Sequence, residues 1–378
     1  MPLPWTEEHR LMRQTVQKFV HHEILPHVER WEEEGSFPRE LYQKAGEIGL
    51  LRVGFAEKEG GLGHDPLMVV AFTEELMRCT SAGVVASLGS LGIGLPPFLL
   101  GGDSALKARL VPEILNGEKI IALAITEPSG GSDVAGIQTR ARRTADGYLI
   151  KGQKTFITSG CRADYFTMAV RTGGEGYGGI SLMLVEADRP GFRRSTPLRK
   201  MGWWASDTAE LFLDDVEVPH DHLIGPENAG FMGIMANFQM ERLNLAVMAV
   251  MTARMALEAC LEYVQQRQAF GRPIGKFQVI RHKLADMATQ IEVAHQYVHH
   301  LAERMSLGDQ VLKEVAMAKN FATQVSDRVT YEAVQIFAGS GYMRGTLVER
   351  LYRDNRILSI GGGTYEVMNE IIAKQLLP

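Results

Sequence analysis

Residues 123–133 read Leu123-Ala124-Ile125-Thr126-Glu127-Pro128-Ser129-Gly130-Gly131-Ser132-Asp133. The stretch begins as an apolar, strand-like segment and then breaks into a turn of proline, glycine and small hydroxyl residues. Gly130 and Gly131 have no side chains, so backbone N–H groups there can approach an anion or the polar edge of a ring, while Thr126 and Ser132 add hydroxyl groups. Taken alone, the pattern also fits an ordinary turn, so the rest of the chain has to distinguish a turn from a ligand-binding loop.

Four further segments follow this stretch in a fixed order. They are Lys154-Thr155-Phe156-Ile157-Thr158-Ser159-Gly160, Glu241-Arg242-Leu243, Arg267-Gln268-Ala269-Phe270-Gly271 with Gln278 beyond it, and Gln335-Ile336-Phe337-Ala338-Gly339-Ser340-Gly341 leading to Gly361-Gly362-Gly363-Thr364-Tyr365-Glu366. The ordered set resembles the acyl-CoA dehydrogenase family, FAD enzymes that desaturate acyl-CoA thioesters. The resemblance runs from about residue 5 to residue 374 and therefore covers nearly the whole chain.

The composition agrees with an enzyme of ordinary globular type. The chain has 378 residues, of which 45% are hydrophobic and 22% charged, enough for two or three domains with a large core. The formal net charge of −5 gives no electrostatic reason to expect nucleic acid or an anionic membrane as a partner. An anionic substrate such as a CoA ester must therefore meet locally placed Arg or Lys side chains.

The three cysteines, Cys79, Cys161 and Cys260, lie far apart and show neither zinc-site nor disulfide spacing. The N-terminus reaches acidic residues almost at once and has no signal-peptide core or basic leader. We find no apolar run long enough to cross a bilayer. From these features we expect a cytoplasmic protein without a metal site.

The spacing of apolar residues divides the chain into three parts. Helical spacing dominates as far as about residue 117, short segments typical of strands follow to about residue 219, and helical spacing returns beyond residue 227. We therefore expect an α+β, mainly α fold, and the resemblance implies that it is of the acyl-CoA dehydrogenase type. Its parts are an N-terminal all-α domain (1–118), a middle β-domain (119–226) and a C-terminal four-helix bundle (227–378).

Several element boundaries can be predicted in the N-terminal part. Thr6 is the expected N-cap of a long helix that reaches about residue 34, and Asp65 and Asp103 are the expected N-caps of two later helices. The apolar stretch 84–100 is expected to be buried.

The middle and C-terminal parts carry fewer but longer signals. The clearest strands cover 182–185 and 209–218, although the pattern does not distinguish a barrel from a sandwich. Long helices are predicted over 229–268, 277–307 and 310–338, with a last helix after Gly363.

Dehydrogenation of a thioester needs a base that removes a proton from the α carbon, a hydride acceptor for the β carbon and a donor that holds the thioester oxygen. In many family members the base is a Glu in the loop before the last helix, where this chain has Gly362. A second group carries the base on the first bundle helix, one residue before an Arg, and Glu241-Arg242 match that arrangement. Glu241 is therefore the candidate base, with a pKa that burial should raise; the alternative is a solvated Glu or one paired with a distant Arg.

The resemblance also implies the substrate contacts. Arg242 would hold the CoA part, Ser132 would lie between cofactor and substrate, and the backbone N–H of Gly362 would hold the thioester oxygen. Gly361 and Gly363 flank that position, and Gly361 with Gly362 would leave room for a branched or wide acyl group. A glycine run before a helix equally often serves only the backbone conformation of the loop. A medium, short or branched acyl chain is the expected substrate.

For FAD, the resemblance implies two groups of contacts and one pair at the last helix. The first group would surround the flavin ring: Leu123, Ile125, Thr126, Ser132, Phe156, Ile157 and Thr158. The second would reach the FAD of a neighbouring subunit: Arg267, Phe270, Gln278, Gln335 and Gly339. The pair Thr364 and Glu366 opens the last helix, whose N–H groups favour a pyrophosphate. Phe156 has the alternative of a buried strand aromatic, and Arg267 that of a partner for a helix dipole.

The implied assembly is a homotetramer, a dimer of dimers, that passes electrons to an electron-transfer flavoprotein in fatty acid β-oxidation. Two other interpretations stay open. One is a different flavoenzyme on the same fold, an acyl-CoA oxidase, desulfinase or monooxygenase. The other is a catalytically silent subunit that binds FAD or acyl-CoA, as the missing loop carboxylate would suggest.

Overall fold

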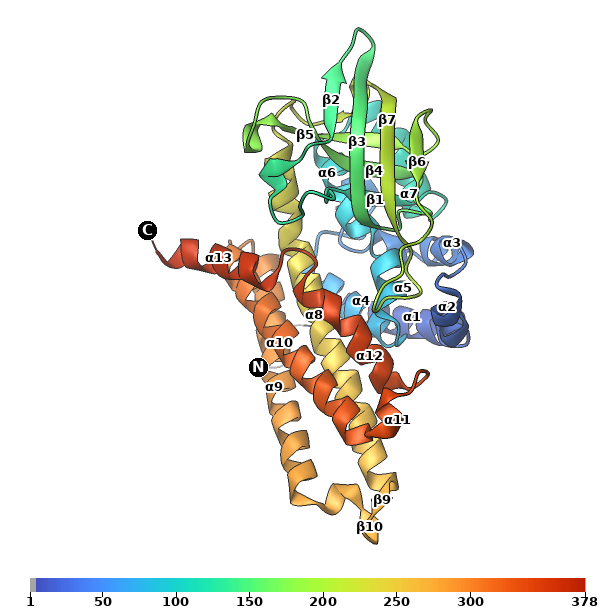
Figure 1. Cartoon of the computed structure of the whole chain (residues 1–378), viewed down its shortest axis with the longest axis vertical. Helices are drawn as coiled ribbons and strands as arrows, with labels where there is room; N and C mark the ends of the chain where they lie inside the picture. The colour runs from blue at the N-terminus through green and yellow to red at the C-terminus, as the bar shows by residue number, and fades with distance from the viewer. Residues whose placement is uncertain (1–4, 378) are drawn as a thin grey trace.

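Helices occupy the first and last parts of the chain, and strands the part between them (Figure 1). The structure, a computed structural model, describes residues 5–377 apart from the side chains of residues 236 and 237. The N-terminal helices are α1 (Glu7–Phe19), α2 (Val28–Glu34), α3 (Glu40–Glu47), α4 (Pro66–Met77), α5 (Ala82–Leu88), α6 (Leu91–Gly101) and α7 (Ser104–Leu115). The C-terminal helices are α8 (Gly230–Gln266), α9 (Gln278–Ser306), α10 (Leu312–Phe337), α11 (Gly339–Tyr342), α12 (Leu347–Asn355) and α13 (Tyr365–Leu376).

The predicted N-caps are confirmed. Thr6 accepts a hydrogen bond from the backbone N–H of His9 and starts α1, while Asp65 and Asp103 cap α4 and α7 in the same way. The single helix expected as far as residue 34 is wrong. A π-helical turn (Val20–Ile24) ends the first helix, and Pro26, which lacks a backbone N–H, separates it from α2.

The strands form one eight-stranded sheet. They are β1 (Ile121–Ala124), β2 (Arg140–Arg143), β3 (Gly147–Thr158), β4 (Tyr165–Arg171), β5 (Ile180–Glu186), β6 (Phe192–Arg194), β7 (Thr208–Pro219) and β8 (Leu223–Ile224). The order is β6-β7-β3-β2-β4-β5-β8, and β1 pairs in parallel with β4. The β3–β7 register shifts between Lys154 and Ile157, so the residues between them form a bulge.

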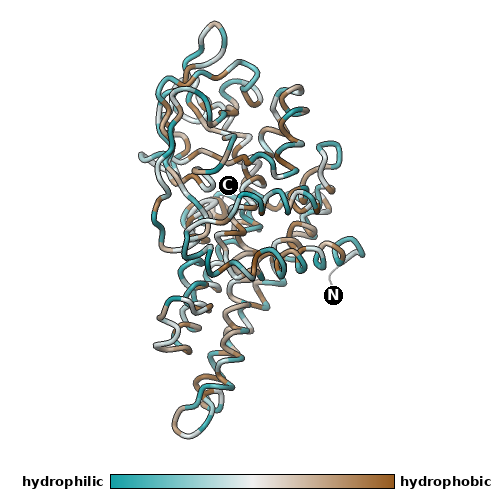
Figure 2. Tube along the Cα trace, turned by 90° about the vertical axis from the view of Figure 1, so that its right-hand side faces the viewer, coloured by the Kyte–Doolittle hydropathy of each residue, from teal (hydrophilic) through white to brown (hydrophobic). Residues whose placement is uncertain are grey.

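The three long helices of the C-terminal part are confirmed to within a few residues. Between α10 and α13 the chain adds α11 and α12, which periodicity did not reveal, and α12 packs against α8 and α10. A small hairpin, β9 (Gln268–Ala269) and β10 (Arg272–Pro273), joins α8 to α9. In both views this end extends away from the rest of the molecule (Figures 1 and 2).

Two helical stretches correct the expectation that no apolar run reaches membrane-spanning length. Ala82–Gly101 and Gly230–Gln266 both pass that test by length and composition. However, 67% of the apolar window in the first stretch and 78% of that in the second are buried inside the protein. Both stretches therefore form part of the core, which explains their apolar composition.

Candidate active site

The loop that precedes α13 lies directly against α8. Nε of Arg242 donates a hydrogen bond to the carbonyl oxygen of Gly362 over 3.1 Å. A Cβ built on Gly362 would lie 3.5 Å from Oε1 of Glu241 and 2.7 Å from Cδ1 of Leu245. Because Gly362 also has a φ of +64°, glycine suits this position both in backbone conformation and in its close approach to α8. The fold thus brings together Glu241 and Gly362, the two positions that correspond to the base in the two groups of the family.

One oxygen of the Glu241 carboxyl group, Oε2, is buried without a hydrogen-bond partner among the described residues. Burial raises the pKa of Glu241 to about 7, against the opposing effect of the charges on Arg242 and Lys319. Glu241 as a residue is half-buried, and its carboxyl group forms no ion pair among the described residues, so this environment favours neither a fully solvated Glu nor one paired with a distant Arg. A carboxyl group with a pKa near neutrality is suited to accept a proton.

Lys319 on α10 is a member of this site that the sequence analysis missed. Its side chain has no solvent exposure, and Nζ donates a 2.6 Å hydrogen bond to the carbonyl oxygen of Gly363. Burial lowers the pKa of Lys319 to about 8. The available signal was a lysine directly after the apolar run Val315-Ala316-Met317-Ala318, but helical spacing alone does not show where its ammonium group goes.

The start of α13 presents backbone donors. Thr364 is the N-cap, with Oγ1 accepting from the N–H of Val367 over 3.3 Å. Among the described residues, no hydrogen bond starts from the N–H groups of Gly362, Gly363 or Thr364. Glu366 is exposed in the first helical turn, and hydrogen bonds with its own N–H and with Thr364 lower its pKa. This segment can therefore offer several N–H groups to an anionic or carbonyl oxygen.

A buried ion pair between Glu127 and Lys154 holds the 126–133 loop against β3. Nζ of Lys154 donates to Oε1 of Glu127 over 2.8 Å and to the carbonyl oxygen of Ile125 over 3.0 Å. The same carboxylate accepts the backbone N–H groups of Gln138 and Thr139 at 2.6 and 3.0 Å. Glu127 lies in the segment 123–133 and Lys154 in the segment 154–160, yet neither spacing nor periodicity predicted their pairing.

One expectation for this loop is corrected. The N–H of Gly130 donates to the carbonyl oxygen of Glu127 over 3.0 Å, and the N–H of Glu127 donates to the carbonyl oxygen of Gly130 over 3.1 Å. Gly130 therefore closes the turn and does not offer its N–H to a ligand. The hydroxyl-bearing residues remain accessible, because Ser132 is exposed and Thr126 is half-buried.

Phe156 is strained and exposed. It lies in the bulge of β3 with a φ of +57°, and 69% of its surface is accessible, so the alternative of a buried strand aromatic is wrong. A left-handed backbone at an aromatic residue costs about 1–2 kcal/mol, and such strain is found mainly at functional sites. Beside it, Thr155 N–H donates to the carbonyl oxygen of Thr126 over 2.9 Å, which joins the bulge to the loop.

The remaining residues of the first expected FAD group lie on the same two segments. Leu123 and Thr158 are half-buried, and Ile125 and Ile157 are buried. The exposed Phe156 ring beside accessible hydroxyl groups, together with the free N–H groups at 362–364, fits a large ring system that carries phosphate groups. FAD has this chemistry, so the residues present fit the cofactor that the resemblance implied.

The second expected FAD group lies elsewhere in the subunit. Arg267 and Phe270 follow the end of α8, about 38 Å along the helix axis from Glu241. Gln335, near the end of α10, lies at the same end, where the rings of Tyr263 and Phe337 stack 4.0 Å apart. The remaining members, Gln278 and Gly339, begin α9 and α11. These residues cannot reach the Glu241 site of their own chain.

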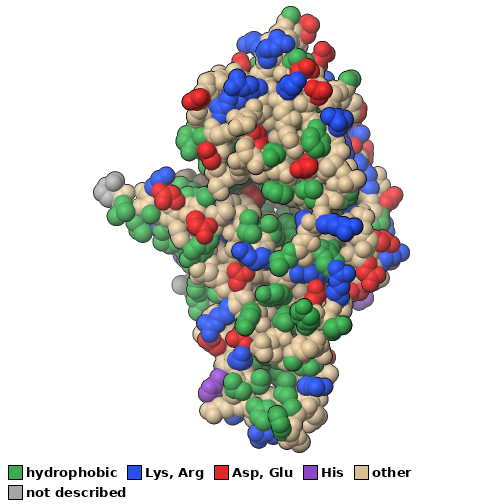
Figure 3. Space-filling view, viewed as in Figure 1, with side chains coloured by type: hydrophobic (Ala, Val, Ile, Leu, Met, Phe, Trp, Pro, Cys, Tyr) green, Lys and Arg blue, Asp and Glu red, His purple; other side chains and the backbone are tan. Residues whose placement is uncertain are grey.

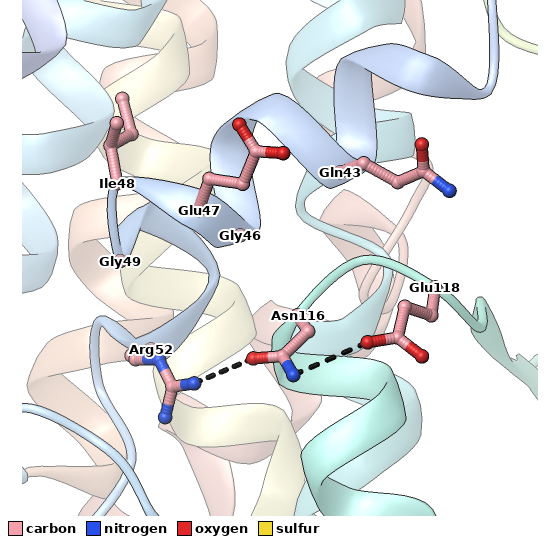
Figure 4. Close-up of a pocket in the computed structure, with 8 residues that line it drawn as sticks. All are labelled: Gln43, Gly46, Glu47, Ile48, Gly49, Arg52, Asn116 and Glu118. Atoms are coloured by element: carbon pink, nitrogen blue, oxygen red, sulfur yellow. Dashed lines mark hydrogen bonds between the residues drawn. The ribbon is translucent and has the colours of Figure 1, made fainter.

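A hollow on the N-terminal helices is separate from this site. It has a volume of about 560 Å³ and is lined by Gln43, Gly46, Glu47, Ile48, Gly49, Arg52, Asn116 and Glu118 (Figure 4). Nη2 of Arg52 donates to Oδ1 of Asn116 over 2.7 Å, and the Asn116 amide donates to Glu118 over 3.3 Å. None of the residues discussed above lines it. Figure 3 shows another hollowed face where the β-domain meets the helices below it, with hydrophobic side chains gathered there.

One histidine cluster resembles a metal-ligand set. Nε2 of His295 and Nε2 of His299 contact Oε1 of Glu74 at 3.0 and 2.6 Å, and the three donor atoms lie within 4.8 Å of one another. Arg13 forms an ion pair with the other oxygen of the same carboxylate. Because that guanidinium group would repel a bound cation, we interpret the cluster as a hydrogen-bonded network around Glu74 that joins α1, α4 and α9.

Three domain families match the chain in order. Acyl-CoA dehydrogenase N-terminal, middle and C-terminal domains match residues 6–118, 122–216 and 228–377. An acyl-CoA dehydrogenase of Bacillus subtilis is 39% identical over 98% of both chains. The mitochondrial long-chain specific acyl-CoA dehydrogenase of Mus musculus is 37% identical over 99% of this chain and 87% of its own length. Among solved structures, a probable acyl-CoA dehydrogenase from Mycobacterium abscessus is 50% identical, with a TM-score of 0.96 over 98% of this chain and 99% of the other.

Proposed function

The chain belongs to the acyl-CoA dehydrogenase family of FAD-dependent oxidoreductases, and from this we propose that it converts an acyl-CoA thioester to the 2-enoyl-CoA with Glu241 as the base. The observation that carries this proposal is the unpartnered Oε2 of Glu241 opposite Gly362. Because the carboxyl group occupies the place where a Gly362 side chain would point, the loop position needs no carboxylate of its own. This argues against a catalytically silent subunit.

The protein groups divide the work of the reaction. Glu241 in its carboxylate form removes the α proton, and its raised pKa makes it a stronger base than an exposed Glu. The free N–H of Gly362 can hold the thioester oxygen, where negative charge develops as the proton leaves. Arg242 and Lys319 are buried and hold the carbonyl oxygens of Gly362 and Gly363, so they would keep this loop in place during the reaction. FAD, when bound, supplies the acceptor for the hydride that leaves the β carbon.

The proposed FAD contacts come from two copies of the chain. Phe156, Thr126 and Ser132 would hold the ring region, with Leu123, Ile125, Ile157 and Thr158 behind them, and Thr364 and Glu366 would act at the N-terminus of α13. The distance along α8 supports a contribution of the distant residues to a partner subunit, since they cannot reach their own site. A homotetramer is therefore the proposed assembly.

The glycine loop contributes unequally to room for the substrate. A Cβ on Gly362 would press on Leu245, and one on Gly363 would lie 2.7 Å from Cε of Met368, so these glycines serve close packing. A Cβ on Gly361 would meet only the carbonyl oxygen of Ile357, at 3.6 Å. Extra width beside the acyl chain therefore rests on Gly361, and we propose a medium, short or branched acyl group.

The physiological setting is part of the same proposal. Arg242 is 3% exposed and bound to Gly362, so its proposed contact with the CoA part would have to be made beside that hydrogen bond. Electrons would pass to an electron-transfer flavoprotein, as the family resemblance suggests. Cys79, Cys161 and Cys260 are free thiols, which suits the reducing cytoplasm.

Anaerobic bleaching of the flavin by straight and branched acyl-CoAs tests the proposal. One class of thioester should bleach the parent protein, whereas Glu241→Gln and Glu241→Ala should retain FAD and bleach at least about 100-fold more slowly. Glu258→Gln, on the same helix but paired with Arg78 at the surface, is the matched control and should behave as the parent. Equal bleaching by the Glu241 variants would exclude Glu241 as the base. Rapid reoxidation by oxygen would instead identify an oxidase.

A further inference from the structure

We propose that Lys319 is a positioning residue for the dehydrogenation: through the Gly363 carbonyl, its buried ammonium group fixes the 361–364 loop, which lies against Glu241. The inference rests on the proposed function for its catalytic meaning. Its structural content, a charge that acts on the loop and on Glu241, does not require that function. No motif of the sequence analysis included Lys319.

The position of Lys319 calls for a specific partner. A fully buried ammonium group is costly unless it is paired or hydrogen-bonded. The hydrogen bond that the structure gives it is the 2.6 Å contact to the Gly363 carbonyl oxygen. The next residue, Asn320, donates to the carbonyl oxygen of Tyr365 and to Oδ1 of Asn369 at 3.1 and 3.0 Å. Two successive residues of α10 therefore hold the loop and the start of α13.

Two cations hold two successive carbonyl groups of the loop. Arg242 binds the carbonyl oxygen of Gly362 and Lys319 that of Gly363. In a trans peptide the C=O and the following N–H point in opposite directions. The N–H groups of Gly363 and Thr364 must therefore point away from the two cations. By fixing these two carbonyl groups, Arg242 and Lys319 orient the N–H groups of Gly363 and Thr364 and hold the Gly362 residue, whose own N–H is the proposed donor to the thioester oxygen.

The charge of Lys319 also acts on the base. Arg242 from α8 and Lys319 from α10 are the charged groups that oppose the effect of burial on Glu241; the other described elements packed around it contribute none. Glu241 in turn favours the charged form of Lys319, while burial and Arg242 oppose it. Loss of the Lys319 charge should leave Glu241 protonated at neutral pH, when it could not accept a proton.

Three substitutions separate the two effects. Lys319→Met removes both the charge and the hydrogen bond, Lys319→Gln removes the charge but keeps a donor, and Lys319→Arg keeps both. Lys313→Met is the control, since Lys313 lies on the same helix and is partly exposed near Glu314. The FAD-loaded protein without substrate is used, and the infrared carboxyl band of Glu241 is identified by its loss in Glu241→Gln.

In Lys319→Met and Lys319→Gln the midpoint of Glu241 ionisation should rise by about one pH unit. Lys319→Arg and Lys313→Met should titrate as the parent. Amide hydrogen exchange in peptides covering residues 357–368 should become at least about threefold faster in Lys319→Met and change less in Lys319→Gln. An unchanged midpoint in both charge-removing variants would overturn the electrostatic role, and unchanged exchange in Lys319→Met would overturn the positioning role.

Activity gives a separate arm. With a reactive thioester, the pH at which kcat reaches half its maximum should rise with the infrared midpoint, while KM changes little. If no thioester bleaches the parent but the infrared midpoint still rises, the proposed function fails and the action of Lys319 stands. If Lys319→Met does not fold, Lys319→Gln with Lys319→Arg still tests the charge.

Discussion

Glu241 and Gly362 face each other between α8 and the loop before α13, so that a Cβ added to Gly362 would lie 3.5 Å from Oε1 of Glu241. A carboxyl group that starts from either position can reach the same region. A long side chain on the helix therefore takes the place of a side chain on the loop. Gly362 suits this arrangement because it has no side chain that would extend toward the Glu241 carboxyl group.

Gly362→Ala should be destabilising, with Gly361→Ala as its control. The first adds a Cβ at a φ of +64° and 2.7 Å from Cδ1 of Leu245, whereas the second adds one that meets a single atom at ordinary distance. We expect a loss of about 1–2 kcal/mol in the free energy of unfolding for Gly362→Ala and less than about 0.5 kcal/mol for Gly361→Ala. Urea denaturation measures both. Equal losses would show that the loop is not fixed against α8.

Glu241→Gln should stabilise the protein in a pH-dependent way. The pKa of Glu241 is about 7 in the folded protein against an ordinary value of 4.5. Below pH 4.5 the group is protonated in both states; as the pH rises to 7 the unfolded chain ionises first, so stability is lost, and above 7 the loss is complete. Glu241→Gln lacks this ionisation, so its free energy of unfolding at pH 8 should be higher than that of the parent by up to about 3 kcal/mol. Thermal unfolding at pH 5 and pH 8 checks the difference, which should be larger at pH 8.

Lys154→Met should weaken both the β-domain and FAD retention. The Lys154–Glu127 pair is buried, with side-chain exposed fractions of 0% and 4%, so removal of the cation leaves an unpaired buried carboxylate. We expect a cost of about 3–5 kcal/mol in the free energy of unfolding and a lower FAD content. Lys151→Met, which breaks an exposed pair on the same strand, should change stability by less than about 0.5 kcal/mol. A small effect at Lys154 would mean that other contacts hold the 126–133 loop.

Phe270→Ala should affect assembly more than folding. The ring is 96% exposed in the subunit and lies at the tip of the hairpin after α8, so a single chain gains little from it. Sedimentation velocity should show a shift to smaller assemblies, accompanied by loss of FAD. Leu100→Ala removes another exposed side chain, 79% accessible on α6, and should leave the assembly intact. Unchanged assembly in both variants would count against a partner contact at Phe270.

The sequence predicted the elements whose signals are local. Capping by Thr6, Asp65 and Asp103 and the extents of α8, α9 and α10 follow from side chains within a few residues of each boundary. The short helices α11 and α12 escaped because they span too few turns for an amphipathic period to emerge. The break before α2 could have been predicted from Pro26, because a proline interrupts a helix even where the spacing of apolar residues continues.

The sequence by itself determined the order of the helical, β and helical parts and the extents of the long C-terminal helices, because these features depend on neighbouring residues, and it contained the adjacent pair Glu241-Arg242. Only the tertiary structure decided that Glu241 meets Gly362, that Lys319 holds Gly363, and that Lys154 pairs with Glu127. It also placed Arg267 and Phe270 far from the base of their own chain. The physical reason is that burial, and the pKa shifts it causes, arise from groups distant in sequence whose approach is set by how helices and strands pack.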